Sequence, residues 1–289
     1  MTPLLVLALA AGLLGGASPE LSLRDDLGRQ VSLDAPAKRV VSLAPGLTES
    51  LFAIGAGDEV VGVTTYCTYP PEALSRQSVG GMTTPSVEAI TALSPDLVVA
   101  TVEGNVREDV LTLERIGIPV FVTNPRTLEG IRRSLTQLGT LTGHEEEAIR
   151  LAGTLKDRED SLREKAPLPP VRALLVLALR PLVVAGSGTF LDDLMRTAGA
   201  ENLGASSVGS YPTISRESVA ARDPEVLMLL SDAVRDTARL LEEFPEWRTM
   251  TAVREGRLVI LDSDLLSRPG PRAVEALAQL SSVLRSVRQ

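Results

Sequence analysis

The sequence has very little of the chemistry that builds disulfides and metal sites. Among its 289 residues there is one cysteine, Cys67, and one histidine, His144. A single cysteine excludes an internal disulfide and a cluster of thiolate ligands, and protein-bound zinc or iron usually needs several imidazoles. We therefore expect no resident metal or other cofactor. The material for a catalytic nucleophile–base pair is equally scarce.

Lysine, aromatic side chains and basic runs are scarce as well. Only three residues are lysine, aromatic residues make up 3% of the chain, and the formal net charge is −8 at pH 7. Because no run of Lys or Arg forms a basic face, nucleic acid is not an expected partner. The hydrophobic content of 44% and the charged content of 23% are typical of a soluble globular protein. The length allows one large domain or two ordinary ones.

The N-terminus carries an apolar run over residues 4–14, followed by Gly15, Gly16 and Ala17. The run is too short to span a bilayer comfortably. It is typical of a secretory signal peptide with a small-residue cleavage site. We expect residues 1–17 to be a signal peptide and the mature protein to be periplasmic or otherwise extracytoplasmic. A basic n-region is missing, so an uncleaved N-terminal anchor remains an alternative.

One stretch of the chain occurs twice. Residues 86–99, SVEAITALSPDLVV, match residues 215–228, SRESVAARDPEVLM, at a spacing of 129 residues. Glu88 pairs with Glu217 in this alignment, and each copy predicts a short helix, a turn marked by proline and a buried strand. The period is too long for a solenoid. The repeat therefore predicts two similar α/β lobes.

Helical and strand patterns alternate along the rest of the chain. Residues 21–33 predict a hairpin, residues 128–141 an amphipathic helix, and residues 97–101 a buried strand without alternation, as in parallel sheets. Another helix is expected to begin near Thr48 and to run through Ile54. The alternation predicts parallel strands joined by crossover helices, and hence a fold of two Rossmann-like α/β lobes with mostly parallel sheets.

A long charged helix is expected in the middle of the chain, over residues 144–165, and prolines follow it at once. About 22 residues span about 33 Å at the helical rise per residue. We interpret this helix as a rigid bridge, and an ordinary surface helix is the alternative. The predicted organisation is an N-terminal lobe over residues 18–142, a connecting helix over residues 143–166 and a C-terminal lobe over residues 167–289.

Motifs for catalysis are missing. Residues 204–208 lack the last glycine of a nucleophile elbow, and there is no Walker loop. What remains is a set of loops, rich in Gly, Pro, Ser, Thr and Tyr, at the predicted carboxyl ends of strands, where ligands bind in open α/β sheets. Two lobes that face each other with such loops would form a cleft. These loops span residues 44–48, 64–71, 79–86, 186–189, 206–213 and 262–271.

Three blocks in order resemble one known family. RVVSLAPGLTESLFAIGAGDEVVGVTTYCTYPPEA, VGGMTTPSVEAITALSPDLVVA and RPGPRAVEALAQL are similar to the substrate-binding proteins of ABC importers for cobalamin, haem and iron-siderophores, and closest to the cobalamin branch. The resemblance covers nearly all of the mature chain. It implies the class III periplasmic binding protein type, with one long connecting helix and limited hinge motion. It also implies a monomer without enzymatic activity that delivers a small molecule to a membrane permease and its ATPase.

The resemblance also implies roles for individual residues. Glu88 and Glu217 match glutamates that dock onto permease arginines in relatives, and the alternative is that they only stabilise the start of a helix. Five further residues match ligand-contacting positions of the cobalamin branch and are expected to bind the ligand. Two of them, Met82 and Tyr211, occupy positions where the best-known cobalamin binder has tryptophans. The predicted ligand-binding residues are Tyr66, Met82, Tyr211, Asp264 and Arg268.

Several readings of the function stay open at this point. The expected ligand is cobalamin. A haem binder of the same family would use Tyr66 or a histidine as axial ligand, and a siderophore binder would use pocket arginines such as Arg268. A hydrolase on a Rossmann-like fold is a more distant alternative, and the scarcity of His and Cys argues against it. A sensor domain of a signalling protein is a third possibility.

Overall fold

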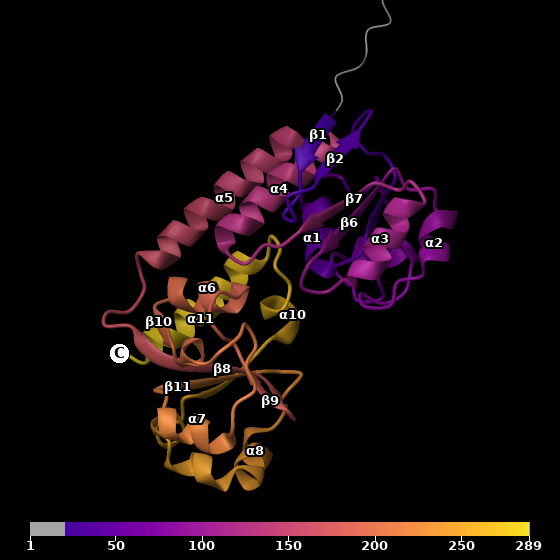
Figure 1. Cartoon of the computed structure of the whole chain (residues 1–289). Coiled ribbons are helices and arrows are strands. Elements are labelled where there is room, and N and C mark those ends of the chain that lie inside the picture. Colours follow the sequence, from indigo (N-terminus) through magenta and orange to yellow (C-terminus); the bar gives the residue numbers. More distant parts are fainter. Residues whose placement is uncertain (1–20, 289) are drawn as a thin grey trace, which may run out of the picture.

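The computed structural model describes residues 21–288, and the predicted signal peptide over residues 1–17 lies outside the described residues (Figure 1). The described chain begins with the predicted hairpin, formed by β1 (Leu21–Arg24) and β2 (Gln30–Leu33) in antiparallel register. No helix in the described range is both long enough and apolar enough to cross a membrane.

The N-terminal half contains a five-stranded sheet in the order β5-β4-β3-β6-β7, and all of its pairings are parallel. Alternate residues of its strands face two different apolar layers. Helices α1 and α4 cover one face, and α2 and α3 cover the other. The elements are β3 (Val40–Ser42), α1 (Pro45–Ala53), β4 (Val60–Val63), β5 (Gln77–Ser78), α2 (Val87–Ala92), β6 (Leu97–Thr101), α3 (Arg107–Arg115), β7 (Val120–Thr123) and α4 (Leu128–Thr142).

The C-terminal half contains a second sheet in the order β10-β8-β11-β12, parallel throughout, with β9 added antiparallel to β8. The antiparallel strand was not expected, and it arises because the short turn at Arg180 and Pro181 reverses the chain directly. Helices α6 and α11 cover one face, and α7 and α8 cover the other. The elements are β8 (Val171–Leu179), β9 (Leu182–Val184), α6 (Phe190–Thr197), β10 (Ala200–Asn202), α7 (Arg216–Arg222), β11 (Val226–Leu230), α8 (Thr237–Glu243), α9 (Thr251–Arg254), β12 (Leu258–Leu261), α10 (Ser263–Leu266) and α11 (Ala273–Ser286).

Helix α5 (Glu145–Arg163) connects the two halves and lies along α4 and beside α11 (Figure 1). Its 19 residues are three fewer than the predicted 22. Buried Leu155 of α5 belongs to an apolar cluster that also includes residues of α4, α6 and α11. This cluster runs without interruption from one sheet to the other. The two halves therefore share a core, which resists large changes in their relative position.

The repeat is present in the structure down to the backbone conformation. Ser86 caps α2 by accepting from the Ala89 amide at 3.1 Å, and Ser215 caps α7 by accepting from the Ser218 amide at the same distance. Each helix is followed by a left-handed residue that is not glycine, Ser94 with φ 45° and Asp223 with φ 41°. Such residues are uncommon, so their equivalent places support duplication of the unit.

The repeat also extends to the strand that pairs with it in each sheet, β3 beside β6 and β8 beside β11. The Arg39 amide donates to Asp96 Oδ1 at 3.0 Å, and the Arg172 amide donates to Glu225 Oε2 at 3.0 Å. Both guanidinium groups also donate to carbonyl groups at the end of the repeated helix, on Leu93 and Arg222. In each half an arginine thus ties the helix–turn–strand unit to the neighbouring strand.

The start of one helix and the content of one loop differ from the prediction. Helix α1 begins at Pro45, three residues before the expected start at Thr48. Proline suits the first helical turn because its missing N–H would have no partner there, and Thr48 instead donates from inside the helix to Ser42 Oγ at 2.8 Å. The predicted loop over residues 262–271 contains α10, which Asp262 caps by accepting from the Leu265 amide.

Candidate functional site

A cavity of about 350 Å³ lies between the two halves. Its walls come from loops that follow the carboxyl ends of β3, β4, β6 and β7, and from the C-terminal half. Five of the six predicted loops contribute residues, whereas the loop over residues 186–189 does not and the following Phe190 and Leu191 do. The lining includes all the predicted ligand-binding residues, namely Tyr66, Met82, Tyr211, Asp264 and Arg268. We call this cavity the cleft.

The cleft has an apolar wall from the C-terminal half, and Asn105 ties together two loops of the N-terminal half. Phe190 and Leu191 at the start of α6 are almost fully buried. Asn105 Nδ2 donates to the carbonyl groups of Leu43 and Met82, both at 2.9 Å. One side chain thus connects the ends of two loops that line the cleft. Asn105 has no distinctive signal in the sequence, because an asparagine between a strand and a helix is typical of any loop.

Two tyrosines stand on opposite halves of the cleft. Tyr66 is 58% exposed, and Tyr211 is 41% exposed. The Tyr211 hydroxyl donates to Glu103 Oε2 at 2.9 Å, and Glu103 Oε1 lies 3.1 Å from the Arg126 guanidinium. Partial burial and the negative charge of Glu103 raise the pKa of Tyr211 well above its usual value. Tyr211 therefore remains a neutral hydrogen-bond donor at neutral pH and connects the two halves across the cleft.

Arg268 is nearly buried, with only 11% of its side chain exposed. Its guanidinium donates to Asp264 Oδ1 at 2.6 Å and to Thr68 Oγ1 at 3.2 Å. It also lies 3.6 Å from Glu49 Oε1 in the N-terminal half. Asp264 and Arg268, both predicted to bind the ligand, therefore contact each other, and Glu49, a carboxylate that the sequence did not point to, also holds the arginine in place.

Glu49 of α1 is the centre of an ion-pair cluster between the halves. Its side chain is 1% exposed, and Arg272 donates to it twice, from Nε at 2.9 Å and from Nη2 at 2.7 Å. Contact with the Glu49 carboxylate raises the pKa of Arg272. We refer to Glu49, Arg268 and Arg272 as the Glu49 cluster. Its geometry is the bidentate arrangement that gives Arg–carboxylate pairs their specificity.

The backbones of the two halves also meet beside the Glu49 cluster. A Cβ atom placed on Gly46 would lie 2.4 Å from the carbonyl oxygen of Pro269. Glycine is therefore required at residue 46, because any side chain would push the halves apart. Together with the Glu49 cluster, this contact sets the width of the cleft.

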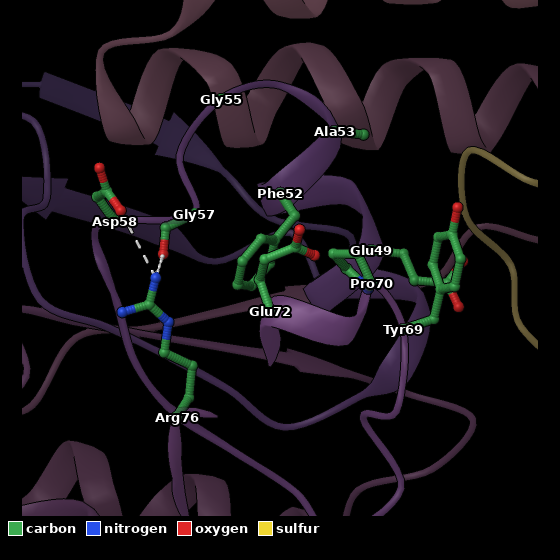
Figure 2. A pocket seen from close by; sticks show the side chains of 10 residues that line it. All are labelled: Glu49, Phe52, Ala53, Gly55, Gly57, Asp58, Tyr69, Pro70, Glu72 and Arg76. Atoms are coloured by element: carbon green, nitrogen blue, oxygen red, sulfur yellow. Dashed lines mark hydrogen bonds and ion pairs between the residues drawn. The ribbon is translucent and has the colours of Figure 1, made fainter. Parts of the chain in front are cut away.

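A second cavity of about 500 Å³ lies within the N-terminal half alone (Figure 2). Arg76 lies at one side of it, donating to the Gly57 carbonyl at 2.9 Å and lying 3.6 Å from Asp58 Oδ1. None of the predicted ligand-binding residues lines it. We assign the candidate site to the cleft, because only the cleft lies at the carboxyl ends of the strands, where α/β sheets bind ligands. The second cavity is lined by Glu49, Phe52, Ala53, Gly55, Gly57, Asp58, Tyr69, Pro70, Glu72 and Arg76.

Glu88 and Glu217 lie outside the cleft. Both are exposed, and they occupy the first turns of α2 and α7, one in each half (Figure 1). The backbone amide of Glu217 and the Ser215 hydroxyl lower the pKa of the Glu217 carboxyl, so it is charged at neutral pH. The structure gives these two glutamates equivalent settings and brings neither to the candidate ligand site.

Two α/β halves with facing strand ends, a long connecting helix and a cleft lined from both sides define a two-lobed solute-binding protein. The chain belongs to the periplasmic binding protein family, whose model matches residues 40–265. Its architecture is that of the class III members, as predicted. The members are non-enzymatic substrate carriers, and some take part in uptake by ABC transporters, so the expectation that the chain is not an enzyme is confirmed.

Relatives with known names include binders of vitamin B12 and of haem. The vitamin B12-binding protein of Pectobacterium carotovorum is 31% identical over 253 residues, covering 86% of this chain and 89% of the relative. The crystal structure of the periplasmic vitamin B12-binding protein of Vibrio cholerae has a TM-score of 0.79 at 29% identity, covering 88% and 99% of the two chains. A periplasmic haem-binding protein from Roseiflexus sp. RS-1 has a TM-score of 0.79 at 27% identity, covering 88% and 100%.

Proposed function

We propose that this protein captures a corrinoid, with cobalamin as the expected form, in the cleft and delivers it to an ABC importer. The observation that carries the proposal is the convergence of the five predicted ligand-binding residues on one cavity between the halves. Relatives named as vitamin B12-binding proteins support the choice of ligand.

The chemistry of the cleft suits such a ligand. A corrinoid is a large, nearly flat ring whose edge carries amide groups. Tyr66 and Tyr211 offer flat, partly exposed rings from the two halves, and aromatic faces pack well against planar groups. Asp264, whose side chain is 64% exposed, adds a hydrogen-bond acceptor for the N–H groups of an amide, and Arg268 holds that carboxylate in place.

Haem is the second candidate, because haem-binding proteins are among the similar structures. A tyrosine that ligates ferric iron does so as phenolate. The raised pKa of Tyr211 disfavours that form, which leaves Tyr66 as the candidate axial ligand. A ferric siderophore would instead need arginines free to bind an anion, and Arg268 is already engaged by Asp264 and Glu49.

We further propose that the protein acts as two lobes, residues 18–142 and 167–289, joined by residues 143–166. In this proposal a signal peptide over residues 1–17 directs export to the periplasm, and the mature protein works as a monomer. Glu88 and Glu217 dock onto the permease, one from each lobe, and the ATPase of the importer drives the uptake. Their exposure and their equivalent places in the repeat support this role.

The ligand is tested by titrating the mature protein calorimetrically with cyanocobalamin, haemin and a ferric hydroxamate siderophore. We expect saturable one-to-one binding of cyanocobalamin and at least about tenfold weaker binding of the other two, a difference of about 1.4 kcal/mol. Tighter binding of haemin would overturn the choice of corrinoid and leave the cleft as the site. Heat of dilution alone for all three ligands would overturn the proposed function.

A further inference from the structure

Glu103 presents a carboxylate to the cleft from the loop after β6. Its side chain is 26% exposed, and it is among the residues that line the cleft. Tyr211 donates to Oε2 at 2.9 Å, and Arg126 lies 3.1 Å from Oε1. Arg126 itself is not part of the lining. A ligand in the cleft would therefore meet the carboxylate and the tyrosine, with the guanidinium behind them.

Each charged residue that lines the cleft already has an oppositely charged partner. In the described part of the chain, the acidic and basic residues of its lining are Glu103, Asp264 and Arg268. The Arg268 guanidinium contacts two carboxylates, Asp264 at 2.6 Å and Glu49 at 3.6 Å. An incoming carboxylate would thus find Arg268 already paired and would meet the Glu103 carboxylate, whose partner Arg126 lies outside the lining.

This arrangement favours one ligand chemistry over another. A carboxylate accepts hydrogen bonds from the N–H groups of a primary amide. It repels a second carboxylate, so like charges brought together at an interface weaken binding. Corrinoids carry amides at the ring edge, whereas haem carries propionates. Tyr211 fixes the Glu103 carboxylate in place and adds no positive charge.

We propose that Glu103 is a specificity-determining residue, held by Tyr211, that admits ligands with neutral amide groups and disfavours ligands with carboxylates. The proposal rests on the proposed function only in placing the ligand in the cleft. It predicts that the protein distinguishes a corrinoid with amide groups from the same corrinoid with a carboxylate. A protein that only prefers cobalamin to haem need not make this distinction.

The test compares cyanocobalamin with its monocarboxylic acids, in which hydrolysis has converted one peripheral amide into a carboxylate. For the wild-type protein at pH 7 we expect at least one of these acids to bind about tenfold more weakly than cyanocobalamin. Glu103→Gln keeps an acceptor for Tyr211 and removes the charge. The ratio of the affinity for cyanocobalamin to the affinity for the acid should therefore fall to within about threefold. Glu146→Gln, an exposed carboxylate on α5, is the control and should leave the ratio unchanged.

A second variant moves the ratio in the opposite direction. Arg126→Gln removes the cation behind Glu103 and should increase the discrimination by about threefold. Equal binding of amide and acid forms by the wild-type protein, or full discrimination retained in Glu103→Gln, would overturn the role of Glu103 while leaving corrinoid binding intact. No binding of cyanocobalamin by the wild-type protein would overturn the proposed function, and this inference with it.

Discussion

Glu49→Ala is expected to lower the free energy of unfolding by about 3–5 kcal/mol, the usual cost of removing one partner from a buried ion pair. The change leaves two arginines, Arg268 and Arg272, with 11% and 21% exposed side chains, facing each other without the carboxylate between them. Urea denaturation at pH 7, followed by far-UV circular dichroism, measures the loss.

Two comparisons separate the Glu49 cluster from a general effect of losing a glutamate. Glu275→Ala removes an exposed carboxylate from the first turn of α11 and should cost no more than about 1 kcal/mol. Arg272→Ala together with Glu49→Ala should cost less than the sum of the single changes, because the two residues contact each other. Two results would contradict the conclusion that the Glu49 cluster stabilises the contact between the halves. One is an additive loss of unfolding free energy in the double variant, and the other is a loss below about 1 kcal/mol for Glu49→Ala.

Glu88→Ala combined with Glu217→Ala is expected to reduce cobalamin uptake at least tenfold and to leave the affinity for free ligand within about twofold. Both carboxylates are exposed and lie outside the cleft lining, so the ligand does not meet them. Charges at the rim of an interface act mainly on the rate of association and on its salt dependence. Uptake by vesicles that contain the importer, measured with radiolabelled cobalamin at two salt concentrations, tests both expectations.

The matched control for docking is Glu129→Ala combined with Glu275→Ala. These exposed carboxylates also occupy the first turns of helices, α4 and α11, one in each half. If Glu88 and Glu217 only stabilise their helices, the control pair should impair uptake equally. That outcome, or a large loss of ligand affinity in the Glu88 and Glu217 pair, would contradict docking.

Elements of the fold could be predicted where the local sequence pattern matches the burial of the same residues in the structure. The duplicated helix–turn–strand was visible because the capping serines, the prolines and the apolar strand residues recur together at one spacing. Strand β6 was recognisable because parallel strands are apolar on both faces. The start of α1 was misplaced, because Pro45 was interpreted as a strand breaker, whereas it begins the helix only three residues after β3 ends.

The site was only half predictable, for a physical reason. Tyr66 and Tyr211 stand out in a chain with few aromatic residues. Glu49 and Glu103 do not, because a glutamate in a helix or a loop is typical of a solvated surface. Glu49 is buried only because α1 packs against the segment before α11, and Glu103 meets Tyr211 only across the cleft. Such pairings depend on contacts between residues more than 100 positions apart.

The central claim is that a corrinoid lies in the cleft and contacts both halves. A crystal structure of the mature protein with cyanocobalamin tests it most directly. We expect ring density between Tyr66 and Tyr211, with a peripheral amide in hydrogen-bond contact with Glu103. Density for the ligand in the N-terminal cavity of Figure 2, or a cleft that stays empty at saturating cyanocobalamin, would contradict it.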